Sequence, residues 1–221
     1  MSIMNTHAFK LVTLTLKKHM GNNLSYHNST HVSRVVERAL YLFDTSNQKY
    51  MEDYKAALII AALGHDIIYI PGSTYNEAAS ADYVVYLMSK FSEFNESPVK
   101  DKVKNLILGT AISEHLSEAE QTPLQNILLD ADLVAMADPY PDFERTQLSI
   151  LAENLGDSSS IPKMKDFLQL FLNKKKIYRC NQIDSFESSA RVNIEMFLNF
   201  NNAHLAQKLQ NYYIEAAINA D

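Results

Sequence analysis

Apolar residues recur along this chain at the spacing of helices that bury one face. Leu205, Leu209 and Tyr212, for example, follow one another at three- and four-residue intervals. Short polar or Gly- and Pro-containing breaks separate such segments from one another. We expect helices at about residues 5–19, 28–43, 52–63, 76–91, 98–114, 123–137, 142–155, 162–176, 185–200 and 203–219. The pattern therefore predicts an all-α fold.

One expected helix is apolar on every side and ends beside two polar residues. Residues 56–64 carry no polar side chain, and His65 and Asp66 follow at once. Such a helix belongs in a core, so the two residues are expected to be buried and to need partners. A divalent cation offsets the cost of burying a carboxylate while keeping its charge. The doublet therefore predicts a metal site, and the Pro- and Gly-containing stretch 69–75 predicts a loop at its mouth.

A second helix offers His27 and His31, which lie four residues apart and so on neighbouring turns. A helical wheel places His31 close to Val35 and Leu42, on the inward face, and places His27 nearer the rim. Either residue alone is better explained as a histidine at the core edge bonded to a backbone carbonyl than as a metal ligand. His31 becomes a candidate ligand only because other candidate ligands exist.

Asp130 and Asp132 lie two residues apart on another expected helix, so they point in different directions. The wheel puts Asp130 in the polar gap and Asp132 inside the apolar arc. We therefore expect Asp132 to be the buried carboxylate and the last metal ligand. The alternative is that it pairs with a basic residue or caps a neighbouring helix.

Composition narrows the class of protein. The chain has 221 residues, of which 47% are hydrophobic, which suits one domain spanning residues 1–221. A net charge of −6 argues against binding to the phosphate backbone of a nucleic acid. The longest apolar stretch is too short to span a membrane. The single cysteine, Cys180, suits a reducing compartment. We expect a cytoplasmic protein with a small-molecule substrate and neither a nucleic acid nor a membrane partner.

The order of the candidate ligands resembles the H…HD…D signature of the HD superfamily of metal-dependent phosphohydrolases. His31 supplies the first position, the doublet His65-Asp66 the second and Asp132 the third. Three short motifs around these positions resemble those of a bacterial subgroup of predicted HD phosphohydrolases: Tyr-His-Asn at 26–28, Asn-Glu at 76–77 and Leu-Asp-Ala-Asp-Leu at 129–133. The resemblance covers about residues 24–139, and helices at about 142–219 are expected to cover this core.

The resemblance implies one divalent ion held by His31, His65, Asp66 and Asp132. Two imidazoles and two carboxylates suit Mn, Fe, Co, Ni or Zn, with Mg also a candidate. The implied activity is hydrolysis of a small phosphate ester, with nucleotides among the candidate substrates, by a metal-activated water. Asp66 is then both ligand and catalytic base. Two alternatives stay open: a non-catalytic helical binding or scaffold module of the same fold, and a phosphodiesterase or alarmone hydrolase of the same superfamily.

A second set of polar residues is expected around this ion. We assign His27, Asn28 and His115 to substrate binding and Glu77 to catalysis, as a residue that orients water or protonates the leaving group. His115 continues a stripe on the expected helix 98–114, so it faces inward and either contacts phosphate or is simply packed. Glu77 alternatively complements the dipole at its helix N-terminus. Superfamily members with two metals carry further histidines between the doublet and the last Asp, whereas this chain has only His115, which favours one ion.

Overall fold

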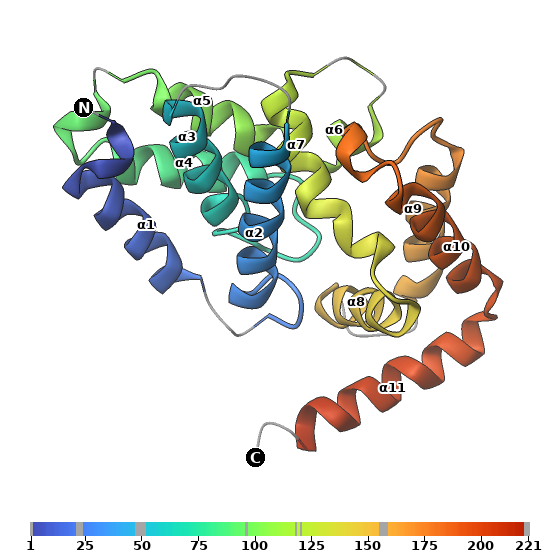
Figure 1. Ribbon diagram of the computed structural model, residues 1–221. Coiled ribbons are helices and arrows are strands. Elements are labelled where there is room, and N and C mark those ends of the chain that lie inside the picture. Colours follow the sequence, from blue (N-terminus) through green and yellow to red (C-terminus); the bar gives the residue numbers. More distant parts are fainter. Residues whose placement is uncertain are drawn as a thin grey trace. The chain divides into compact units, whose positions relative to one another are not determined.

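The computed structural model describes residues 2–20, 24–46, 52–95, 97–117, 119, 121–154 and 159–218 (Figure 1). All regular secondary structure in these ranges is helical, which confirms the all-α fold. The α-helices are α1 (His7–His19), α2 (Ser29–Thr45), α3 (Glu52–Gly64), α4 (Asn76–Met88), α5 (Val99–Leu108), α6 (Ile112–Leu116), α7 (Pro123–Leu133), α8 (Tyr140–Glu153), α9 (Ser160–Asn173), α10 (Phe186–Asn199) and α11 (Asn202–Ile218). The 3₁₀ helices are η1 (Ile3–Asn5), η2 (Ser92–Phe94), η3 (Val134–Ala137) and η4 (Asn181–Ile183).

The expected continuous helix over residues 98–114 is wrong, because the chain breaks between α5 and α6. The Thr110 hydroxyl donates to the Ile107 carbonyl at 2.7 Å, which takes up an acceptor at the end of α5. Ala111 is extended, with ψ at 144°, so α6 begins in a new direction. The expected helix 123–137 likewise tightens into η3 after Leu133. The expected end of α8 at residue 155 lies outside the described residues.

Contacts group the chain into two compact units. The first comprises Met1–Asn23 and His27–Asp132, and the second comprises Leu24–Tyr26 and Leu133–Asp221. The expectation of one domain over residues 1–221 remains a prediction.

In the first unit, α3 lies at the centre, because a helix that is apolar on every side can be stable only where all its faces are covered. Helices α1, α2 and α5 pack around it, and α4 packs against both α3 and α5. At Gly64, the last residue of α3, the absence of a side chain lets Val84 of α4 lie close to the α3 backbone. A Cβ atom built there would lie 2.5 Å from Val84 Cγ2 on α4, so no larger residue fits without movement.

In the second unit, α10 packs against η3, α8 and α9, while α11 packs against α8 and α9. The buried Asn193 amide donates to the carbonyls of Met136 and Asp138 at 2.8 Å each, which closes the end of η3. The Arg191 guanidinium donates to the carbonyls of Leu172 and Lys174 and so satisfies backbone acceptors at the end of α9.

Among the described helices, none combines the length and the apolar character that crossing a membrane requires.

Candidate metal centre

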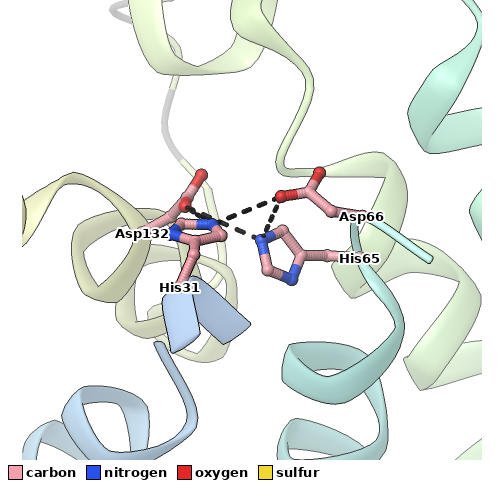
Figure 2. Close-up of side chains that lie close together, drawn as sticks. All are labelled: His31, His65, Asp66 and Asp132. Atoms are coloured by element: carbon pink, nitrogen blue, oxygen red, sulfur yellow. Dashed lines mark ion pairs between the residues drawn. The ribbon is translucent and has the colours of Figure 1, made fainter. Parts of the chain in front are cut away.

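The four side chains expected to be ligands meet at one point. His31 comes from α2, His65 and Asp66 directly follow α3, and Asp132 comes from the last turn of α7 (Figure 2). One nitrogen or oxygen atom from each residue lies within 4.8 Å of all the others. The first unit therefore contains a group able to hold a metal ion.

The separations between these atoms match a shared cation. His31 Nε2 lies 3.3 Å from Asp66 Oδ2 and 3.2 Å from Asp132 Oδ1. His65 Nε2 lies 2.9 Å from Asp66 Oδ2 and 3.7 Å from Asp132 Oδ1. Nitrogen and oxygen ligands at about 2.1 Å from one ion stand about 3–3.4 Å apart at tetrahedral or octahedral angles. The separations of 2.9, 3.2 and 3.3 Å are close to this range, and the separation of 3.7 Å is longer.

The α2 N-terminus fixes the backbone that carries His31. The Asn28 side chain accepts hydrogen bonds from the backbone N–H groups of Thr30, at 2.9 Å, and His31, at 3.3 Å. Asn28 is thus the N-cap of α2, since its oxygen satisfies donors that the first turn leaves unpaired. Its expected role in substrate binding remains a prediction.

The His65 ring is set for ligation through Nε2. Its Nδ1 lies 3.0 Å from the Ala62 carbonyl, and donation by Nδ1–H leaves the lone pair on Nε2. His65 is 1% exposed, and its Nε2 makes no hydrogen bond of acceptable geometry. A buried polar atom without a hydrogen bond is costly. Coordination of a cation would remove this cost, so the residues fit a metal.

The cluster holds opposite charges close together in a mostly buried site. Burial alone would lower the pKa of His31 and of His65, but the neighbouring carboxylates of Asp66 and Asp132 outweigh it and raise both values, that of His65 well above normal. Burial alone would raise the pKa of each carboxyl group, but the histidines outweigh it and hold both values below their usual range. Both carboxylates are therefore ionised at neutral pH, as ligands must be.

Asn76 and Ser80 of α4, for which the sequence predicted no role, hold the segment after the doublet. The buried Asn76 amide accepts from the Ile70 N–H at 3.0 Å and donates to the Ile70 carbonyl at 3.1 Å. The Ser80 hydroxyl makes the same pair of contacts with Ile68, at 3.1 and 3.2 Å. Both residues are polar, four apart and on a largely apolar helix, which is the signal that could have identified them.

The expected exposures of the two aspartates on α7 are wrong. Asp130 is the buried one, at 1% exposed, whereas the Asp132 side chain is 19% exposed. The helical wheel assumed that α7 buries one face, but residues 127–131 are all buried. Asp132 lies near the helix end, where its carboxylate reaches the cluster from the more accessible side.

The remaining expected residues differ in their distance from the cluster. The half-buried His27 ring stacks on Tyr69, with centroids 3.6 Å apart, and lies 5.8 Å from the His31 ring. His115 is buried, with Nε2 at 3.5 Å from Asp132 Oδ2, although on α6 and not on the long helix that was expected. Glu77 lies in the first turn of α4. In the described part of the chain, no hydrogen bond or ion pair joins its carboxylate to the cluster.

Comparison of the chain with protein-family models and with curated proteins found no match. The resemblance to the HD superfamily therefore rests on the motifs in the sequence and remains a prediction.

Proposed function

We propose that the chain is a metal-dependent phosphohydrolase that acts on a small phosphate ester, with nucleotides among the candidate substrates. The observation that carries the proposal is the convergence of two imidazoles and two ionised carboxylates from three separate segments. The order of these residues along the chain, which resembles the HD signature, supports it further. The lone cysteine, Cys180, supports a reducing compartment, and we propose the cytoplasm.

His31, His65, Asp66 and Asp132 would hold one divalent ion, for which this donor set suits Mn, Fe, Co, Ni or Zn, with Mg also a candidate. When bound, such an ion lowers the pKa of a water molecule and neutralises charge on a phosphoryl group. Four protein ligands leave positions for that water and for a phosphate oxygen in a six-coordinate ion.

We assign Asp66 as the base that accepts a proton from the attacking water. Its Oδ2 faces both histidines, its side chain is 13% exposed, and its lowered pKa keeps it unprotonated before the reaction. His27 lies within electrostatic reach of Asp66 and is oriented by its stack on Tyr69, so a phosphate contact by its imidazole is consistent with its place. We retain Glu77 as the candidate acid for the leaving group, because it opens α4 next to the 69–75 loop.

The test is phosphate release by purified protein with Mn²⁺ or Co²⁺, using phosphomonoesters, nucleotides, phosphodiesters and guanosine alarmones as substrates. We expect metal-dependent turnover that falls by about 10²–10⁴-fold in Asp66→Asn. Asp82→Asn is the matched control, because Asp82 is exposed on α4 and its hydrogen-bonded ion pair with Lys104, at 3.1 Å, lies on the surface, where such pairs contribute little to stability. Turnover that is confined to the diesters or alarmones would favour the phosphodiesterase or alarmone-hydrolase alternative. Metal binding without turnover on any compound would favour the scaffold alternative.

A further inference from the structure

The two oxygens of the Asp132 carboxylate face different partners. Oδ1 lies toward the cluster, 3.2 Å from His31 Nε2 and 3.7 Å from His65 Nε2. Oδ2 lies on the other side, 3.5 Å from His115 Nε2. The His115 side chain is 6% exposed, so it approaches the carboxylate from inside the protein. One carboxylate thus joins the candidate metal ligands to a histidine from another helix.

The geometry sets His115 apart from the ligands. The four ligand atoms lie within 4.8 Å of one another, and His115 does not belong to this group. The break between α5 and α6 redirects the chain just before His115, through the Thr110 hydroxyl and the extended Ala111. This short helix therefore presents His115 to the rear of Asp132 and not to the point that the four ligands share.

We infer that His115 is a positioning residue that holds Asp132 as a ligand through one oxygen. Its Nε2–H would donate to Oδ2, which leaves Oδ1 as the oxygen offered to the ion. The end torsion of an aspartate side chain is broad, so an unrestrained Asp132 can turn both oxygens toward a cation. Partners that orient ligating carboxylates are worth about 10–100-fold in metal affinity. The inference rests on the metal centre of the proposed function, but not on the reaction.

Two amide variants separate this role from mere packing. In His115→Gln the side-chain nitrogen lies about as far from the backbone as Nε2, so it can still donate to Oδ2. In His115→Asn the nitrogen takes the place of Nδ1 and falls short. Both variants replace the ring by a smaller polar amide, so each controls for the packing that the other loses. The measurements are Co²⁺ affinity by competition with a chelator, stoichiometry by titration, and the visible spectrum of the bound Co²⁺.

We expect one Co²⁺ per chain in every variant. His115→Asn should bind about 10–100-fold more weakly and with an altered spectrum, since Asp132 then changes the number of oxygens it contributes. His115→Gln should stay within a few-fold of wild type with an unchanged spectrum. In an Asp132→Asn background the difference between the two variants should disappear, because an effect that acts through Asp132 needs that carboxylate.

Three results would overturn the inference while the metal centre stands. These are equal affinity and spectra for both variants, a persistent difference between them in the Asp132→Asn background, and a second Co²⁺ equivalent that either variant loses. The last would make His115 a ligand of a second ion. Wild-type protein that binds no Co²⁺ would overturn the metal centre and this inference together. Co²⁺ binding with the expected variant pattern but no phosphate release would overturn the proposed activity alone.

Discussion

Replacement of Gly64 by alanine tests the contact on which the position of the doublet depends. The added Cβ would lie 2.5 Å from Val84 Cγ2, well inside ordinary contact distance, and Val84 is fully buried. A valine on a helix has one strongly preferred rotamer, so it cannot simply turn away. Overpacking of this kind costs about 1–3 kcal/mol. The higher helix propensity of alanine offsets up to about 1 kcal/mol, and less at a final helical residue.

We therefore expect Gly64→Ala to lower the free energy of unfolding by about 1–2 kcal/mol, which corresponds to about 2–8 °C in melting temperature for a chain of this size. Urea unfolding gives the free energy directly. Co²⁺ affinity should also fall, because His65 and Asp66 follow Gly64 without a break.

A double-mutant cycle identifies the cause. Val84→Ala removes the atom that the new methyl group meets, so Gly64→Ala should cost about 1–2 kcal/mol less in that background. Gly109→Ala is the matched control, since the nearest neighbours of its added Cβ are on Asn105, Leu106 and Gln125 and not on Val84. Additivity within about 0.5 kcal/mol for the Gly64 and Val84 pair would refute the steric reasoning.

Three further predictions concern the cluster and its support. Co²⁺ at about a hundred times the wild-type Kd should raise the free energy of unfolding by about 2.7 kcal/mol, or about 5–11 °C in melting temperature. Asp132→Asn, which keeps the other three ligands, should show a smaller rise at the same Co²⁺ concentration; an unchanged wild-type melting temperature would contradict this. Without metal, burial opposes protonation of His65 but the carboxylates prevail, so its pKa lies well above 6.5. The protonated ring then contributes stability that is complete below pH 6.5 and is lost as the pH rises through the folded-state pKa. Urea unfolding in EDTA should show this fall, and His65→Gln should reduce it to the smaller contribution of His31, whose pKa the same carboxylates raise; stability that rises over the same range would count against the assignment. Asn76→Ala removes both hydrogen bonds to Ile70 and should cost about 1–3 kcal/mol, with weaker Co²⁺ binding; a loss below about 0.5 kcal/mol would show that these bonds do not hold the segment.

Local signals in the sequence were enough to place most helices. The Thr122-Pro123 pair predicted the start of α7, which begins at Pro123 with the Thr122 hydroxyl accepting from the Gln125 N–H at 3.3 Å. The apolar run before the doublet predicted a buried helix, and α3 is that helix. Such features depend on residues a few positions apart, so a single sequence contains them.

Features that depend on contacts between helices were not predictable in the same way. A helical wheel ranks positions by one apolar face, and it failed for Asp130 because α7 is covered on more than one side. The periodicity of residues 98–114 continues across the break at Thr110, since one hydroxyl and one extended residue end α5 without a change in apolar pattern. His115 nevertheless faces inward, for a reason that the periodicity did not contain.

Helix α4 shows why the ligands alone do not explain the centre. It supplies none of the four ligands, yet it contacts the chain on both sides of the doublet. Val84 meets Gly64 just before His65, while Asn76 and Ser80 bind the backbone at Ile70 and Ile68 just after Asp66. The doublet is thus fixed between two contacts with one rigid helix, and His31 and Asp132 approach it from α2 and α7. Substitutions of Val84, Asn76 or Ser80 should therefore change metal affinity although none of the three touches a ligand, because they move two of the four ligands together.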